Sequence, residues 1–215
     1  MAGRKKDPIQ TEATRHTIIE KSYELFSTKS IEKVTMSEIA RASGFGDMTV
    51  YRYFPTKPML VVAAATWKWS QFYEEVAKKE ANRALGGVTA AESFAFYLDS
   101  FLDLYKNHVA LLRFSQFFNV YIQSEKISAE ILQPYRRMID GFRAMFHETY
   151  LKAEQDRTVR TDEPEDQMFS KTLHLMLAVV TRYAVGLVYS PESGFDPEKE
   201  LIAQKEMLLD RYRNE

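Results

Sequence analysis

The sequence contains no cysteine, and glycine and proline are scarce, with eight and seven residues in 215. Without cysteine the chain has no disulfide framework and no thiolate metal site, which is consistent with a reducing compartment. The few glycines and prolines fall in clusters, and the apolar residues between the clusters recur at helical spacing. Alternating patterns typical of strands are rare. These features predict an all-α fold.

Long apolar runs are absent too. No stretch of 18 or more uninterrupted apolar residues exists, so the sequence predicts no transmembrane helix. The N-terminal stretch MAGRKKDPIQ is basic, but no apolar run follows it, and it lacks the pattern of a secretory signal. We therefore expect a cytoplasmic protein that does not bind a membrane.

Periodicity, caps and breakers predict about nine helices. We expect them at residues 11–28, 36–43, 47–54, 57–85, 89–107, 109–123, 128–153, 166–189 and 198–214. Thr35 with Glu38 and Thr89 with Glu92 have the spacing of a capping box, which marks two helix starts. Pro134 lies inside the seventh segment, where we expect a kink or a later start.

Charge is unevenly distributed along the chain. The net charge is −1, yet residues 1–60 carry ten basic and seven acidic side chains, which leaves −4 for the remainder. A basic front on an acidic body favours a polyanionic partner for the front alone. The tripeptide Arg4-Lys5-Lys6 is either a basic arm that follows such a partner or a solvated tail.

Two short helices at residues 36–43 and 47–54, joined by a tight turn at Gly44-Phe45-Gly46, match the helix-turn-helix pattern. In such a module the second helix lies in the major groove while the first crosses the DNA backbone. Val50 and Phe54 lie four residues apart and are expected to pack inward. The outward positions are Met48, Thr49, Arg52 and Tyr53, with Tyr51 at the margin.

A longer stretch, residues 14–60, resembles the N-terminal DNA-binding domain of the tetracycline-repressor (TetR) family. The resemblance rests on three motifs: Arg15-x-x-Ile18-Ile19 … Leu25-Phe26, Thr35 … Ile39-Ala40-x-x-Ser43-Gly44, and Tyr51-x-Tyr53-Phe54-x-x-Lys57-x-x-Leu60. It implies a three-helix DNA-binding domain at residues 1–56 and a helical ligand-binding and dimerisation domain at residues 57–215.

The resemblance also implies roles for single residues. Phosphate contacts are expected from Thr35, Thr49, Tyr51, Tyr53 and Lys57, and base contacts from Asp47, Met48 and Arg52. The sequence departs from the family at Gly46, where Ser or Thr usually caps the recognition helix. It departs again at Ser30 or Ile31, where the family usually has Gly.

Aromatic residues are frequent in the part of the chain that follows the helix-turn-helix module, from Trp67 onward. At helical spacing such residues are usually core, but pockets between helices are also lined by aromatic groups. The resemblance implies a cavity for a mostly apolar or aromatic effector. Its expected walls are Phe101, Phe114, Phe117, Phe118, Tyr121, Phe142, Phe146 and His174, although for His174 the sequence slightly favours a satisfied core or interface role.

The segment 166–189 is apolar on nearly all sides, and a helix of that kind must be buried all round. With the last helix it is expected to form a two-fold interface between two copies of the chain. The interface residues predicted are Met176, Val180, Tyr183, Leu187, Leu201, Leu208 and Tyr212.

Other functions have less support in the sequence. No nucleophile elbow, zinc-protease pair or phosphate loop is present, so we predict no enzyme, no cofactor and no metal. The expected function is a homodimeric repressor of palindromic operator DNA that a small molecule releases. The alternative is a helical ligand-binding or interaction protein that does not bind DNA.

Overall fold

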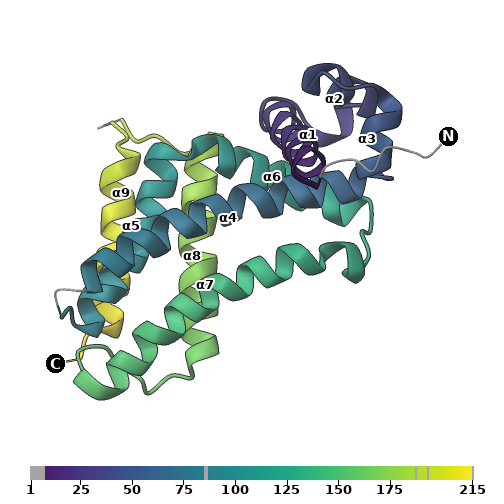
Figure 1. Cartoon of the computed structure of the whole chain (residues 1–215). Coiled ribbons are helices and arrows are strands. Elements are labelled where there is room, and N and C mark those ends of the chain that lie inside the picture. The colour runs from purple at the N-terminus through teal and green to yellow at the C-terminus, as the bar shows by residue number, and fades with distance from the viewer. Residues whose placement is uncertain (1–7, 85–86, 187, 193, 215) are drawn as a thin grey trace. The chain divides into compact units, whose positions relative to one another are not determined.

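The computed structural model describes residues 8–84, 87–186, 188–192 and 194–214, and it is all-helical, as predicted. Nine α-helices and one short 3-10 turn fall within these residues, and the one β-bridge there is isolated, between Val159 and Arg213. The helices, labelled in Figure 1, are α1 (Pro8–Thr28), α2 (Met36–Ser43), α3 (Asp47–Tyr53), α4 (Lys57–Ala84), α5 (Ala90–Asn107), α6 (Val109–Ser124), α7 (Ala129–Asp156), α8 (Glu165–Val185) and α9 (Pro197–Tyr212).

Two helix ends differ from the sequence prediction. α7 begins at Ala129 and continues through Pro134, so the later start is not observed. Pro134 is the sixth residue of α7, past the first four N–H groups that lack an intrahelical partner, so the helix continues with the loss of one backbone hydrogen bond. α8 ends at Val185 rather than at residue 189, because Gly186 follows with φ of 84°, a left-handed value that other residues rarely adopt.

The contacts divide the chain into two compact units. The first, here called the N-terminal unit, contains the residues up to Ser70 together with residues 114–137; the second, the C-terminal unit, contains residues 71–113 and those from Met138 onward. The predicted domain boundary between residues 56 and 57 therefore does not coincide with the division between the units. Three helices, α4, α6 and α7, contribute to both.

The N-terminal unit is built on a small aliphatic and aromatic core. Its fully buried side chains come from α1, α2, α4 and the 3-10 turn at Ile31–Lys33, and they include Ile18, Phe26, Ile31, Ile39 and Leu60. The α6 residue Phe114 stacks on Phe26 with ring centroids 6.5 Å apart. The core under the first three helices is thus completed by a residue that lies far away in the sequence.

In the C-terminal unit, α5 packs against α8 and α9. The side chains between these helices are largely aromatic: Phe94 lies edge-on to Phe146 and to Tyr212, and Phe146 contacts Phe169. Asp156, at the end of α7, accepts a hydrogen bond from the backbone N–H of Ala90 at 2.6 Å. The start of α5 is therefore fixed by a residue of another helix.

Candidate functional site

The start of α2 is a complete capping box. The Thr35 hydroxyl accepts a hydrogen bond from the backbone N–H of Glu38 at 3.1 Å, and the Thr35 N–H donates to the Glu38 carboxylate at 2.8 Å. The backbone N–H of Thr35 and the ammonium of Lys29 lower the pKa of Glu38. Gly44 ends the helix with φ of 75°, which lets the chain turn sharply toward α3.

α3 presents two different faces. Val50 and Phe54 are buried, which confirms the expected inward pair, whereas Met48 is 84% exposed and Tyr51 46% exposed. The Arg15 guanidinium lies 5.4 Å from the centre of the Phe54 ring, so α1 holds the end of α3 in place. The helix is thus anchored on one side and open on the other, as a helix that enters a groove requires.

The start of α3 lacks a side-chain cap because Gly46 occupies the N-cap position. The Asp47 carboxylate instead accepts a hydrogen bond from the Ser37 hydroxyl in the first turn of α2. This bond ties the two helices together and holds the carboxylate on the α2 side. Ser37 was not among the residues singled out from the sequence, and only its place in the first turn of α2 could have drawn attention to it.

The remaining predicted contact residues gather around the end of α3. The Arg52 guanidinium lies 5.2 Å from the centre of the Tyr53 ring. Lys57 donates a hydrogen bond to the carbonyl of Glu32 at 3.2 Å, and its ammonium lies 5.9 Å from the centre of the Tyr121 ring. Partial burial lowers the pKa of Lys57. Lys57 therefore joins the start of α4 to the 3-10 turn and to α6.

All eight predicted DNA-contact residues belong to the N-terminal unit. Thr35, Asp47, Met48, Tyr51 and Arg52 are exposed, and Thr49, Tyr53 and Lys57 are half-buried. The side of the module formed by α3 and the start of α2 therefore offers hydroxyl, guanidinium and thioether groups.

Comparison with known proteins identifies this module. Residues 18–64 match the model of the bacterial regulatory proteins of the tetR family. Residues 18–64 belong to the TetR family of DNA-binding domains. No curated protein sequence matches the chain.

Solved structures of similar fold cover nearly the whole chain. The chain is similar to a transcriptional regulator from Saccharomonospora viridis in complex with choline (TM-score 0.72, 15% identity, 95% of this chain and 100% of the other). It is also similar to FadR from Bacillus subtilis in complex with stearoyl-CoA (TM-score 0.69, 18% identity, 90% of this chain and 97% of the other). A third similar structure is AibR in complex with isovaleryl coenzyme A and operator DNA (TM-score 0.63, 15% identity, 91% of this chain and 98% of the other).

The eight predicted effector-wall residues do not form one group. Phe114, Phe117, Phe118 and Tyr121 belong to the N-terminal unit, and Phe101, Phe142, Phe146 and His174 belong to the C-terminal unit. Phe114 and Phe118 are fully buried and stack on each other with ring centroids 6.0 Å apart. They are core residues of the unit that contains the DNA-binding module.

His174 is exposed on α8, where its ring nitrogen lies 3.4 Å from the Ser170 hydroxyl of the same helix. Its exposure gives no support to the predicted role as a cavity wall, and its apolar neighbours Leu175 and Ala178 are exposed as well. Phe101 and Phe146 are buried in the C-terminal unit.

A buried hydroxyl that sequence reasoning missed lies beside them. Tyr97 of α5 packs edge-on against Phe101 and Phe146, with ring centroids 5.4 Å away in both cases. Within the described residues, its hydroxyl is buried and has no hydrogen-bond partner, and burial strongly raises its pKa. An unpaired buried hydroxyl is unfavourable by about 1–3 kcal/mol, so it is a natural anchor for a polar group of a ligand.

The predicted dimer-interface residues are mostly covered by their own chain. Met176, Val180, Leu201, Leu208 and Tyr212 are all less than one tenth exposed. They pack inward in the C-terminal unit and are not available to a second copy, so the prediction is corrected for these five. Tyr183 is half-buried and donates a hydrogen bond to Glu200 at 2.6 Å, and Leu187 lies outside the described residues.

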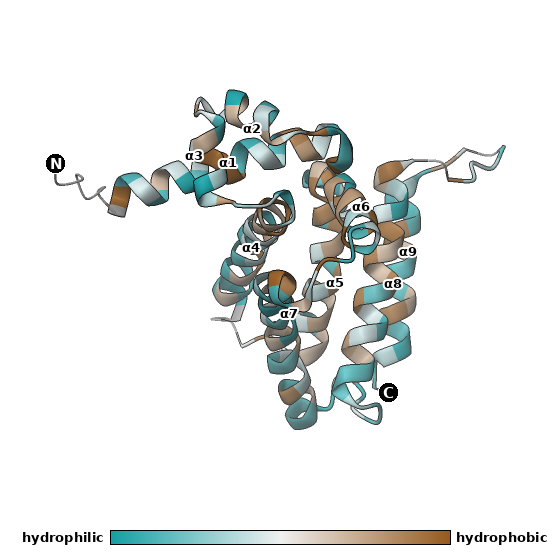
Figure 2. Ribbon diagram, turned by 90° about the vertical axis from the view of Figure 1, so that its right-hand side faces the viewer, coloured by the Kyte–Doolittle hydropathy of each residue, from teal (hydrophilic) through white to brown (hydrophobic). Residues whose placement is uncertain are grey.

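Other apolar side chains of the same two helices are exposed. On α8 they are Leu175, Ala178 and Val185, and on α9 they are Ile202 and Met207. The three α8 residues lie on one stripe of that helix, whereas Ile202 and Met207 lie on different sides of α9. Figure 2 shows hydrophobic segments alternating with hydrophilic ones along α8 and α9. We call these five residues the α8–α9 apolar set.

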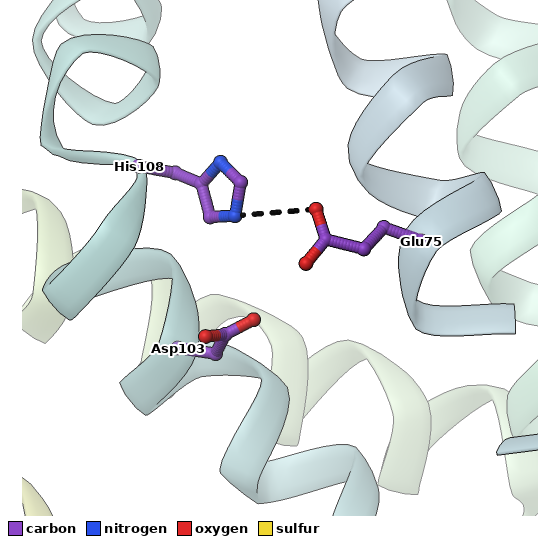
Figure 3. Close-up of side chains that lie close together, drawn as sticks. All are labelled: Glu75, Asp103 and His108. Atoms are coloured by element: carbon purple, nitrogen blue, oxygen red, sulfur yellow. Dashed lines mark ion pairs between the residues drawn. The ribbon is translucent and has the colours of Figure 1, made fainter. Parts of the chain in front are cut away.

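Figure 3 shows one cluster of metal-ligating residue types, Glu75, Asp103 and His108, whose ligand atoms lie within 4.8 Å of one another. His108 Nε2 lies 3.5 Å from the Glu75 carboxylate. The Lys79 ammonium contacts Glu75 at 2.7 Å and Asp103 at 3.0 Å. Lys79 already supplies the positive charge between the carboxylates, so a metal ion would have to displace it.

No described helix is long and apolar enough to cross a membrane.

Proposed function

We propose that this chain is a homodimeric transcriptional repressor that binds palindromic operator DNA through α3 and is released by a small, mostly apolar or aromatic effector. The observation that carries this proposal is the division of α3 into a buried face, Val50 and Phe54, and an exposed face that includes Met48 and Arg52. Residues 1–56 are proposed as the DNA-binding domain and residues 57–215 as the effector and dimerisation domain.

On the exposed face of the module, we propose that some residues contact DNA bases and others contact phosphates. Arg52 is proposed as a bidentate partner for guanine, and Met48 as an apolar contact for a thymine methyl group. The Asp47 carboxylate is held by Ser37, which favours a contact to a base amino group over an approach to phosphate. The proposed phosphate contacts are Thr35, Thr49, Tyr51, Tyr53 and Lys57.

Fluorescence anisotropy with the DNA upstream of the chain's own gene tests the proposal. The free protein should bind one segment selectively, and the affinity should fall as salt rises. Arg52→Ala should weaken specific binding about tenfold or more, the loss expected for one bidentate base contact. Arg136→Ala, at an exposed position of α7, is the matched control and should leave affinity unchanged. Absence of selective, salt-dependent binding would instead favour the ligand-binding protein without DNA binding.

We place the two-fold interface on the α8–α9 apolar set. Exposed apolar residues on two neighbouring helices favour a self-complementary packing of α8 and α9 against the same helices of a second copy. Such a dimer would carry two α3 helices to half-sites roughly 34–36 Å apart, or a multiple of that spacing.

Sedimentation velocity tests the interface. Leu175→Glu combined with Met207→Glu should shift the chain from dimer to monomer, because two carboxylates would be buried without partners. Val120→Glu changes a similarly exposed apolar residue on α6 and should leave the dimer intact. Dimerisation that survives the double substitution would place the interface elsewhere.

The effector is proposed to bind in the C-terminal unit beside Phe101 and Phe146, with its polar group at the Tyr97 hydroxyl. Ligands in the similar structures, stearoyl-CoA, isovaleryl coenzyme A and choline, combine apolar and polar parts. They form a starting panel for thermal-shift screening. A ligand that raises the melting temperature of the native chain but not of Tyr97→Phe would support this position.

A further inference from the structure

The N-terminal unit contains a cavity of its own, with a volume of about 720 Å³. Its walls come from α1, the end of α3, the first half of α4 and the start of α7, all of them within the same unit. Pockets that bind small molecules have volumes of roughly 300–1,000 Å³. The cavity shares no lining residue with the effector position proposed at Tyr97.

The walls are rich in aromatic rings. His16 lies edge-on to Trp67 with ring centroids 5.4 Å apart, and Tyr53 and Phe54 line the same space. Ring faces attract positive charge, and the ammonium of Lys68 already lies 5.6 Å from the centre of the Trp67 ring. The lining therefore suits a flat apolar body and tolerates a cation close to it.

The charged groups of the wall favour a cation over an anion. The one cationic side chain among the lining residues other than histidine, Arg15, already contacts the Phe54 ring and lies 3.8 Å from Glu12. Glu130, at the start of α7, is exposed, and among the described residues its carboxylate has no hydrogen-bond or ion-pair partner. Among the lining residues Arg15 is already paired with Glu12, which leaves the Glu130 carboxylate without a counter-ion.

A proline lies one helical turn after that carboxylate. Pro134 has no N–H, so it cannot donate the usual helical hydrogen bond to the carbonyl of Glu130. Both residues line the cavity. The Glu130 carboxylate suits a ligand group that carries N–H donors and a positive charge.

We infer that this cavity binds a protonated aryl-alkyl amine, with the ammonium at Glu130 and the ring system against the His16–Trp67 pair. The site is distinct from the proposed effector position, because all its residues belong to the N-terminal unit. Tyr53 lines the cavity and is also a proposed phosphate contact, so an occupant should weaken DNA binding. That coupling rests on the proposed function, whereas binding of the amine does not.

Titration calorimetry on the full chain without DNA tests the site with three probes of one shape. 1-Naphthylmethylamine is protonated at neutral pH, 1-naphthylmethanol is its neutral analogue, and 1-naphthoate is an anion of similar size. The cation should bind about fivefold more tightly than the alcohol, as one partly exposed ion pair allows, and the anion should bind most weakly. Equal binding of all three probes would overturn the inference.

Variants locate the binding. Glu130→Gln should reduce the affinity for the cation to that for the alcohol, whereas Glu148→Gln, at another exposed position of α7, should change nothing. Ala63→Phe should fill the cavity and remove binding of both probes, with circular dichroism checking its fold. Cation binding that survives both Glu130→Gln and Ala63→Phe would place the probe elsewhere and overturn the site.

The same amine tests the coupling. At saturation it should lower the affinity of the native chain for operator DNA and leave that of Glu130→Gln less affected. Binding of the amine with unchanged DNA affinity would overturn the coupling and leave the site standing. Failure of the chain to bind DNA at all would refute the proposed function alone, since calorimetry decides the site without DNA.

Discussion

The same capping box begins a helix in each compact unit, at Thr35–Glu38 for α2 and at Thr89–Glu92 for α5, yet different contacts hold the two helices. α2 has eight residues and is positioned by the left-handed turn at Gly44 and by the Ser37–Asp47 hydrogen bond. α5 has eighteen residues and is positioned by its packing against α8 and α9. Local signals thus specify one helix, and tertiary packing specifies the other.

The two units also differ in where their polar side chains lie. In the N-terminal unit, the polar side chains of α3 lie on the exposed face, while the buried positions Val50 and Phe54 are apolar. In the C-terminal unit, the Tyr97 hydroxyl lies inside the core without a partner among the described residues. A surface that binds DNA needs exposed polar groups, whereas a unit that binds a ligand in its interior needs at least one buried polar group.

The largest expected effect tests whether the N-terminal unit depends on α6. Phe114→Ala removes a fully buried ring that contacts Phe26 and Tyr23, and it should destabilise the protein by about 3–5 kcal/mol. DNA binding should fall with it, although residue 114 lies outside the DNA-binding motif. Chemical denaturation and anisotropy measure both quantities. Phe101→Ala in the C-terminal unit is the comparison, and a smaller loss of DNA affinity there would support separate roles for the units.

A smaller effect of opposite sign tests the buried hydroxyl. Tyr97→Phe removes an unpaired polar group without opening a cavity, so it should raise the free energy of unfolding by about 1 kcal/mol. Tyr150→Phe is the control, because the Tyr150 hydroxyl donates to the carbonyls of Thr161 and Glu163. That substitution should lower stability. Equal effects of the two substitutions would show that Tyr97 is not unsatisfied in solution.

Acid should act on both units through the capping boxes. Hydrogen bonds from the backbone N–H groups of Thr35 and Thr89 lower the pKa of Glu38 and Glu92 below the usual 4.5. A lowered pKa means that the folded state favours the carboxylate. The stabilisation is therefore complete above 4.5 and is lost as the pH falls through the lower folded values.

Thermal melts across this acidic range, on the native chain and on Glu38→Gln with Glu92→Gln, measure the contribution. The double variant should lose part of the pH dependence, because a glutamine can still accept the capping hydrogen bond but does not titrate. An unchanged profile would mean that other carboxylates dominate acid unfolding.

The smallest expected effect concerns the start of α3. Gly46→Ser should stabilise the protein by a few tenths of a kcal/mol, because serine adds the missing cap. A β carbon at this position meets no atom within 4 Å. Gly44→Ser should have the opposite effect, since φ of 75° is unfavourable by about 1 kcal/mol for a residue with a side chain. Differential scanning calorimetry resolves the two signs, and destabilisation by Gly46→Ser would contradict the open geometry.

The sequence predicted best what local signals determine. The nine helices, both capping boxes and the inward pair Val50 and Phe54 follow from periodicity and caps within a few residues of each site. The match of residues 18–64 to the tetR family model confirms the family that the Tyr51–Leu60 motif suggested. Short-range chemistry was sufficient for these features.

Partners of buried residues could not be predicted in the same way. Periodicity indicates that Met176 and Val180 are covered, but it does not distinguish cover by the same chain from cover by a second copy. It likewise marks Phe114 as buried without saying that α1 provides the contact. The Tyr97 hydroxyl can be recognised as unpaired only from the three-dimensional positions of the groups around it.

Gly46 has an evolutionary consequence. Its backbone lies in the extended region, with φ of −78°, and its surroundings are open, so serine, threonine, asparagine and aspartate all fit. Codons for glycine and serine differ by a single nucleotide in several cases. Under the proposed function, a lineage could strengthen repression in one mutational step without remodelling the module, and revert as easily.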